Sequence, residues 1–297
     1  MPEGDTIHNA ALRVGNALVG KEILAIETPH PRHRMDRWPE RLAGRAVRAV
    51  DARGKHLFLR FEGGLTLHSH LRMGGKWGVY ERGRRWTRSA RRAWLVIRTA
   101  GHDVVQFDGP VLELMTDSRT RLDQLLAGLG PDVVSDDFDE RAYLARLRED
   151  DQTRAIGEAL IDQRNVAGIG NIWKSEGCFM AGIDPWRRVA DVTDDEALAI
   201  ARAIRAPIRE SARRGGPTVT FQGEAEPAAA IARAAAVDAL RIDDRLPRRG
   251  AADRDRRAGT WVYDRAGLPC RVCSTPILAH GQGDDNRTTY WCPVCQT

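Results

Sequence analysis

No apolar run in this 297-residue chain approaches the ~18 residues that a membrane-spanning helix needs, because Arg, Asp or Gly interrupts each run early. The first residues, MPEGDTIH, also lack the basic and then apolar pattern of a secretory signal peptide. We therefore expect a soluble, cytoplasmic protein with no membrane partner. With 42% hydrophobic residues the chain can fill a core, and its length suits about two domains at ~100 to 200 residues each.

Lysine is also rare, because the 46 basic residues include only Lys21, Lys55, Lys76 and Lys174. The formal charge of +5 hides an uneven distribution along the chain. Residues 1–100 hold 20 basic and 9 acidic side chains, residues 101–210 hold 13 and 22, and residues 211–297 hold 13 and 10. The resulting charges of +11, −9 and +3 indicate a phosphate-binding face in the first third, although an Arg-rich surface without a ligand would give the same count.

The first third has the pattern of a β-domain preceded by one helix. Apolar residues at helical spacing predict a helix over residues 5–15, which places Met1 to Glu3 directly before its N-terminus. Short β-type segments punctuated by glycine follow and predict a β-sandwich or barrel. The expected strands cover residues 46–52, 56–61, 65–70, 93–98 and 104–107.

The chain becomes helical after Gly130-Pro131. Helical periodicity with Asp or Thr at the starts predicts helices over residues 138–148, 153–161, 172–178 and 194–213, the last ended by Gly215-Gly216-Pro217. We expect an α+β multidomain protein. Its predicted parts are a β-sandwich domain at 1–120, a helical domain at 132–226, a linker or insertion at 227–258 with a helix near 228–240, and a finger at 259–297.

Four of the five cysteines form two pairs near the C-terminus. Cys270 and Cys273 are separated by two residues, as are Cys292 and Cys295, and eighteen residues lie between the pairs. This spacing is typical of a zinc ribbon, in which four thiolates hold one structural Zn²⁺. Two disulfides or an iron–sulfur site are the alternatives. The fifth cysteine, Cys178, lies in an apolar stretch and is interpreted as a buried structural thiol.

Between the cysteine pairs, residues 286–291 form a β-type run after the turn residues 281–285 and predict a two-stranded ribbon. Arg287 near its tip is a candidate for contacting a phosphate, with a further hydroxyl contact from Thr289. An exposed hairpin arginine without a ligand remains the alternative.

A glycine-rich turn, Gly168-Ile169-Gly170, lies between two predicted helices. Glycines let a backbone approach a ligand closely, and the amides that open the second helix, from Gly170 onward, favour a phosphate. Asn171 could donate an amide hydrogen to it, and Lys174 lies one turn further along. A tight helix–helix turn without a ligand explains the pattern equally well.

Taken together, these motifs resemble the formamidopyrimidine-DNA glycosylase and endonuclease VIII (Fpg/Nei) family of base-excision repair enzymes. The resemblance spans most of the chain. Its motifs are the MPEG start, Arg53-Gly54-Lys55-His56, the stretch from His68 to Gly74, the helix–two-turns–helix segment from Asp162 to Ile172, and the finger with Arg287 and Cys292 to Gln296.

The resemblance implies a role for most of the candidate residues. In the family the initiator methionine is removed and the new N-terminal proline is the nucleophile, which corresponds to Pro2 here, with Glu3 as the general acid and base. Lys55 and Arg287 correspond to further catalytic residues that also contact DNA. Asn171, Gly170 and Lys174 correspond to the phosphate-binding segment. Met73, with Leu71 and Arg72 as further candidates, corresponds to a wedge that fills the gap left by a flipped nucleotide.

Two features of the sequence point to different branches of the family. The formamidopyrimidine branch carries an Arg-x-Phe pair in a second loop, where this chain has residues 106–110 with the sequence QFDGP. This departure, together with Gly4-Asp5-Thr6, resembles the endonuclease VIII branch. The GGPT sequence at 215–218 and the CRVCSTPI sequence at 270–277 resemble the formamidopyrimidine branch instead.

The sequence therefore predicts a monomeric, nucleoid-associated bacterial DNA glycosylase and AP lyase that acts on damaged DNA. Oxidised pyrimidines are the favoured lesions, removed through an iminium at Pro2 with strand nicking by β,δ-elimination. The alternatives are a glycosylase for oxidised purines, a damage-binding protein without catalysis, and a zinc-ribbon transcription or translation factor.

Overall fold

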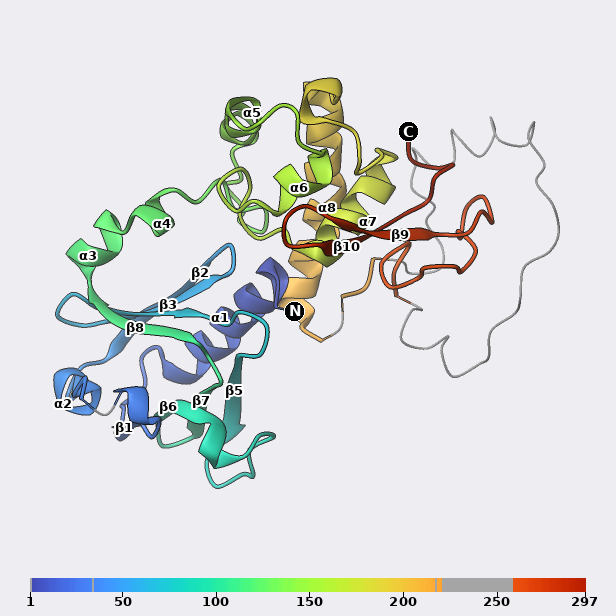
Figure 1. Cartoon of the computed structure of the whole chain (residues 1–297). Helices are drawn as coiled ribbons and strands as arrows, with labels where there is room; N and C mark the ends of the chain where they lie inside the picture. Colours follow the sequence, from blue (N-terminus) through green and yellow to red (C-terminus); the bar gives the residue numbers. More distant parts are fainter. Residues whose placement is uncertain (1, 34, 217, 221–258) are drawn as a thin grey trace. The chain divides into compact units, whose positions relative to one another are not determined.

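The computed structural model describes residues 2–33, 35–216, 218–220 and 259–297. The predicted insertion at 227–258, including its expected helix, lies outside these residues. The chain divides into two compact units (Figure 1). Unit 1 comprises residues 1–129 and 212–215, and unit 2 comprises residues 130–211 and 216–297. Within the described residues, no helix is both long and apolar enough to cross a membrane.

Unit 1 begins with helix α1 (Gly4–Leu18), as the apolar spacing predicts. Ile7, Ala11, Val14 and Leu18 recur every three or four residues, so they lie on one face and are buried against the strands. The short helices of this unit were not predicted, since they lack apolar periodicity. They are α2 (Trp38–Leu42), α3 (Asp117–Leu122) and α4 (Gln124–Ala127).

The strands of unit 1 form two antiparallel four-stranded sheets among the described residues. One has the order β2-β3-β4-β8 and the other β1-β6-β7-β5, with the apolar core between them and against α1. The strands are β1 (Ala25–Glu27), β2 (Val47–Arg53), β3 (His56–Phe61), β4 (Leu65–His70), β5 (Lys76–Glu81), β6 (Ala93–Arg98), β7 (His102–Phe107) and β8 (Val111–Thr116). The predicted β-sandwich is confirmed; β1, β5 and β8 were not among the expected strands.

Unit 2 contains the predicted helices, with ends shifted by a few residues. They are α5 (Glu140–Glu149), α6 (Ile156–Ile161), α7 (Asn171–Ala181) and α8 (Asp194–Arg214), whose last residues belong to unit 1. Helix α8 ends where predicted, because Gly215 adopts a φ of 68° that few other residues tolerate.

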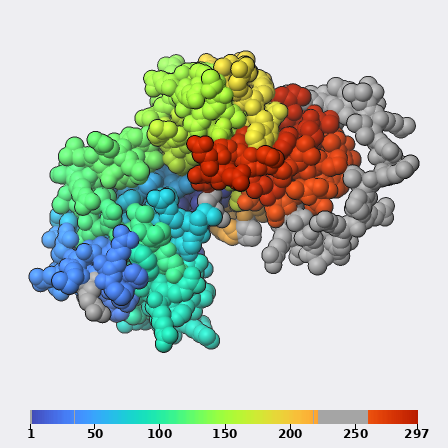
Figure 2. Space-filling model, in the orientation of Figure 1, coloured from blue at the N-terminus to red at the C-terminus, as the bar shows by residue number. Residues whose placement is uncertain are grey.

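The predicted ribbon is present as β9 (Leu278–Gln282) paired antiparallel with β10 (Arg287–Trp291). It packs on α7, so the predicted helical domain and finger share unit 2 and form one continuous body in the space-filling view (Figure 2). Phe179 of α7 stacks on Trp261 in an apolar cluster that also contains the cysteines of the finger. Helix α7 therefore supports both the ribbon and the cysteine cluster.

Candidate functional site

The candidate nucleophile Pro2 directly precedes the N-cap of α1. Glu3 is that N-cap, with an extended backbone, and its carbonyl oxygen accepts a hydrogen bond from Ile7 N at 3.1 Å. Glu3 is only 1% exposed, whereas Pro2 is partly exposed. A largely water-excluded carboxylate beside Pro2 suits proton transfer to a group bound there.

Lys55 lies in the tight turn between β2 and β3. Gly54 has a φ of 56°, as a two-residue hairpin turn requires at its first position, and Arg53 pairs with His56 across it. The Arg53 guanidinium donates a hydrogen bond to the Leu129 carbonyl oxygen at 2.9 Å, which anchors the base of the hairpin. The lysine is thus presented at a rigid tip.

Three histidines cover the sheet surface next to this hairpin. His56 Nδ1 and His68 Nε2 are 2.8 Å apart, and the His70 ring lies 4.7 Å from the His56 ring, centroid to centroid. Burial lowers the pKa of His56 to about 3 and that of His70 to about 4, and nearby Arg72 adds to both shifts. The cluster is therefore neutral at physiological pH.

Met73, the predicted wedge, is 73% exposed on the turn that joins β4 and β5. The sequence that replaces Arg-x-Phe offers no second apolar group at residues 106–109. Phe107 is fully buried, with its ring at an edge-on angle to Tyr80 and Trp86, and Gln106 is buried as well. Leu71, the other apolar candidate of the wedge, is buried in the core, so Met73 is the large apolar side chain that this turn presents to solvent.

The glycine turn between α6 and α7 is held by the side chain of Gln163. Its Nε2 donates to the carbonyl oxygens of Ile161 and Ile169 at 2.8 and 2.9 Å, and its Oε1 accepts from Gly168 N at 3.0 Å. Gly168 has a φ of 98°, so a side chain there would be strained. Gly170 is the N-cap of α7, so the first backbone amides of the helix directly follow this fixed turn.

The first turns of α7 bind successive residues of β10. Asn171 Nδ2 donates to the Thr288 carbonyl oxygen at 2.7 Å, and Ser175 Oγ accepts from Tyr290 N at 3.4 Å. An amide nitrogen carries two hydrogens, so the bond to Thr288 leaves a second donor on the same nitrogen. Asn171 therefore lies beside the strand that begins with Arg287.

The position of Lys174 corrects the prediction that it contacts DNA. Its side chain is fully buried, and Nζ donates to Thr289 Oγ1 at 2.6 Å and lies 3.4 Å from Gln282 Oε1. Thr289 is fully buried too, which removes its predicted hydroxyl contact with a phosphate. Both side chains lie inside unit 2, because the ribbon covers this face of α7.

Arg287 begins β10 and keeps about a third of its side chain exposed. Its Nη2 lies 2.9 Å from Asp285 Oδ2 in the adjoining turn. A pair this exposed contributes little to stability and can exchange for a stronger anion such as a phosphate. Asn171 bonds to Thr288, the residue that follows Arg287 in β10.

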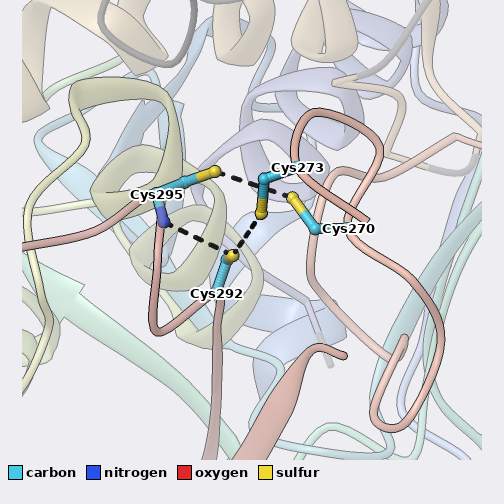
Figure 3. Close-up of side chains that lie close together, drawn as sticks. All are labelled: Cys270, Cys273, Cys292 and Cys295. Atoms are coloured by element: carbon cyan, nitrogen blue, oxygen red, sulfur yellow. Dashed lines mark hydrogen bonds between the residues drawn. The ribbon is translucent and has the colours of Figure 1, made fainter. Parts of the chain in front are cut away.

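The four predicted metal ligands converge on one point (Figure 3), and their sulfur atoms all lie within 4.8 Å of one another. The Cys270–Cys295 and Cys273–Cys292 sulfur distances are 3.8 and 3.4 Å. Tetrahedral Zn²⁺ with Zn–S bonds of ~2.3 Å needs sulfur atoms about 3.8 Å apart, so the cluster fits this metal. Cys178 lies apart from it, and burial raises its pKa to about 12, as expected of a structural thiol.

Glu176 is an important residue that the sequence analysis missed. Its fully buried carboxylate accepts hydrogen bonds from the backbone N–H groups of Trp261, Val262 and Tyr263 at 2.7 to 2.9 Å. It also accepts one from the Thr220 hydroxyl. A carboxylate on the apolar face of a helix, next to Cys178 and Phe179, was the available indication of a buried anchor.

Family models match most of the chain. The "Formamidopyrimidine-DNA glycosylase N-terminal domain" matches residues 1–120, and the "Formamidopyrimidine-DNA glycosylase H2TH domain" matches residues 129–223. The chain is 40% identical to "Probable endonuclease 8 2" of Streptomyces coelicolor, a match that covers 100% of this chain and 94% of the relative. It is 34% identical to "DNA-(apurinic or apyrimidinic site) lyase Nei2" of Mycolicibacterium smegmatis, over 100% and 99% of the two chains.

The fold also matches solved structures. A Lactococcus lactis FPG mutant in complex with DNA containing Fapy-dG superposes with a TM-score of 0.75 at 24% identity, and the match covers all of both chains. At this identity the likeness concerns the fold, and it agrees with the β-sandwich and helical parts described above.

Proposed function

This chain belongs to the formamidopyrimidine-DNA glycosylase and endonuclease VIII family, in the endonuclease VIII branch, and we propose that it removes oxidised pyrimidines from DNA through a covalent intermediate at Pro2. Members of this family are bifunctional DNA glycosylases and AP lyases of base-excision repair, and this chain is one of them. Damaged DNA is its partner. The residue roles below are our assignments.

The observation that carries the mechanism is the buried Glu3 carboxylate directly after Pro2. Once Met1 is removed, Pro2 has a free secondary amine, and such a terminal amine, with a reference pKa of about 8, is partly unprotonated at cellular pH. Its lone pair attacks the sugar C1′ while the C1′–N bond to the base breaks and the base leaves with that electron pair. Loss of the amine proton and opening of the sugar ring then give an iminium.

Glu3 supplies and accepts the protons of this sequence. In its protonated form it donates to the sugar O4′ as the ring opens, and the resulting carboxylate can take a proton back during elimination. Loss of the C2′ proton expels the 3′ phosphate, and a second elimination expels the 5′ phosphate. Water finally hydrolyses the iminium and frees Pro2 for another turnover.

Phosphate contacts would hold the strand during these steps. Lys55, at the tip of its hairpin, contacts the phosphate next to the lesion and favours the departure of the base. Asn171, the amides that follow Gly170, and Arg287 bind the backbone from unit 2. The exposed side chain of Met73 enters the base stack where the damaged nucleotide has left it.

The lesion class follows from the branch. One relative named above is called a probable endonuclease 8 and the other a lyase Nei2, and residues 106–109 lack an exposed side chain like that of the formamidopyrimidine branch. We therefore favour oxidised pyrimidines over oxidised purines. Competition between duplexes that contain thymine glycol and duplexes that contain 8-oxoguanine tests this choice, and faster excision of 8-oxoguanine would reverse it.

Borohydride trapping tests the chemistry itself. The demethionylated protein should form a stable covalent adduct with oligonucleotides that contain thymine glycol, dihydrouracil or an abasic site. Pro2→Gly should reduce trapping sharply, and Glu3→Gln should abolish base excision while sparing some lyase activity on abasic DNA. Absence of an adduct on all three substrates would overturn the proposal and leave a damage-binding role.

We also propose that the protein acts as a monomer, carries one structural Zn²⁺ and works in the bacterial cytoplasm on the nucleoid. The cysteine cluster supports the metal site, and the bacterial source of the relatives supports a bacterial protein. Light scattering at micromolar concentration should give the mass of one chain. A fluorescent fusion should colocalise with DNA, and a dimer mass or a location away from DNA would contradict them.

A further inference from the structure

The Met73 turn is rigid although Met73 itself is exposed. Leu71 is buried in the sandwich core, and its carbonyl oxygen accepts a hydrogen bond from Gly75 N at 2.9 Å, which closes the turn. A Cβ atom at position 75 would stand 2.7 Å from that oxygen, so a glycine is required there. The turn therefore holds an apolar side chain in water on a fixed backbone.

One arginine joins this turn to the turn that follows β7. Arg88 lies in the loop between β5 and β6, and its Nη1 donates to the Gly74 carbonyl oxygen at 2.7 Å and to Asp108 Oδ2 at 2.6 Å. The two charged side chains are only 26% and 24% exposed. A charge-assisted bond with this degree of burial is stronger than a surface ion pair.

Asp108 is itself fixed in place. Arg92 donates to its second carboxylate oxygen at 2.9 Å, and Asp108 N donates to the Arg92 carbonyl oxygen at 3.1 Å. Gly109 packs against the buried amide of Gln106, where a Cβ would lie 1.2 Å from Gln106 Nε2. The Gln106 amide thus fills the space beside Gly109, and the Arg92 contacts hold the turn after β7.

We propose that Arg88 and Asp108 are positioning residues that hold the Met73 turn in the conformation that enters the base stack. This inference rests on the proposed function. A wedge on a loose turn loses conformational freedom when it inserts, whereas a turn that is ordered beforehand avoids that cost. The Gly75–Leu71 bond closes the turn from within, and Arg88 with Asp108 adds a fixed support from the neighbouring loops.

The rate of insertion can be measured directly. A duplex that contains dihydrouracil with 2-aminopurine as its neighbour reports unstacking by stopped-flow fluorescence, and a Glu3→Gln background keeps the lesion base attached. Arg88→Gln and the nearly isosteric Asp108→Asn should each slow the fluorescence change about ten-fold. Arg85→Gln removes the same charge from an exposed position in the same loop and should change the rate by less than about two-fold.

A double-mutant cycle shows whether Arg88 acts through Met73. In a Met73→Ala background, Arg88→Gln should slow insertion little further, so the effects of the two substitutions on the insertion rate are not additive. Full additivity, or an equal effect of Arg85→Gln, would overturn the proposal and reduce Arg88 to a general contribution of charge. Thermal unfolding of each variant shows whether the fold of unit 1 is retained, and Asp108→Asn serves if Arg88→Gln does not fold.

Single-stranded abasic DNA separates this inference from the proposed function. It has no opposite strand to restack, so lyase activity on it should be the same for Arg88→Gln and for the unaltered chain. If the unaltered chain lacks lyase activity on both single-stranded and duplex abasic DNA, the proposed function fails. If the activity is present and Arg88→Gln leaves duplex insertion unchanged, only the positioning role fails.

Discussion

Two of the chain's four lysines lie in opposite environments. Lys55 is in the hairpin between β2 and β3, and Lys174 is in the first turns of α7. Lys55 stands at a turn of the unit whose sequence is strongly basic, with part of its side chain exposed. Lys174 is fully buried beneath the ribbon, where a threonine hydroxyl and a glutamine amide oxygen surround its ammonium group. One lysine lies partly exposed in a hairpin turn, and the other joins two elements of the same unit.

The same contrast applies to the charges of unit 2, which holds most of the acidic middle third of the sequence. Many of its arginines are paired within the unit, as Arg154 is with Asp150 and Arg187 with Glu196. The groups that we propose for a phosphate are the N-terminus of α7, the Asn171 amide and Arg287, whose own pair with Asp285 is exposed. The net charge of a segment therefore does not predict whether it contacts a phosphate. The partner of each charged side chain within the protein is the better guide.

The largest effect should come from removing the metal. Structural Zn²⁺ contributes on the order of 10 kcal/mol in small zinc-finger folds, and here it would hold the segment that carries the partners of Lys174. Cys273→Ala should abolish stoichiometric zinc binding and weaken DNA binding more than about 100-fold, as measured by elemental analysis and fluorescence anisotropy. Cys178→Ala is the matched control, and equal loss of zinc in both variants would contradict the assignment.

Replacing Lys55 should affect DNA and not the fold. Lys55→Gln is expected to lower the rate of excision by about 10²-fold and to reduce the slope of log affinity against log salt by about one. The melting temperature should stay the same. An unchanged salt slope would mean that Lys55 makes no phosphate contact.

Replacing Lys174 should do the reverse. Lys174→Met removes the ammonium group that donates to the buried Thr289 hydroxyl, which itself bonds to Gln282. The substitution should lower the free energy of unfolding by about 1–3 kcal/mol. Its salt slope should match that of the unaltered chain. A fall of about one in that slope, with stability unchanged, would restore Lys174 to the DNA contacts and end the contrast with Lys55.

A smaller effect is expected from the histidines beside Lys55. Burial lowers the pKa of His56 to about 3 and of His70 to about 4, with Arg72, Arg53 and Lys55 adding to it, while Glu113 and Asp123 face His68. Folded His56 and His70 bind fewer protons than the unfolded chain, so their contribution to stability is complete above about pH 6.5 and falls as the pH drops toward 4. Melting temperatures from pH 7 to 4 should fall less steeply in His56→Asn, whereas the exposed His280→Asn should keep the original slope.

Periodicity in the sequence predicted the elements with one clear buried face. Helix α1 and strands β3, β4 and β6 match their expected ranges closely, because apolar residues mark each buried face. Strand β5 was missed because Gly78, which lies against the Tyr80 ring, interrupts its pattern. Helices α3 and α4 were missed because Leu122 and Leu125 are exposed and mark no core-facing side.

The candidate site was predictable where spacing determines geometry, as in the four cysteines. It was not predictable where burial decides the role of a residue. Lys174 and Glu176 lie two residues apart, and local sequence does not reveal that the ribbon covers one and that backbone amides from residues 261–263 surround the other. Such contacts bridge about 85 to 115 residues of chain.

The most direct test is to locate the covalent bond in the borohydride-trapped complex. After protease and nuclease digestion, tandem mass spectrometry should place the reduced sugar remnant on the nitrogen of Pro2, in a peptide that lacks Met1. A lysine is the obvious rival, since it also forms imines with an opened sugar. An adduct on Lys55, or on any residue other than Pro2, would contradict the account.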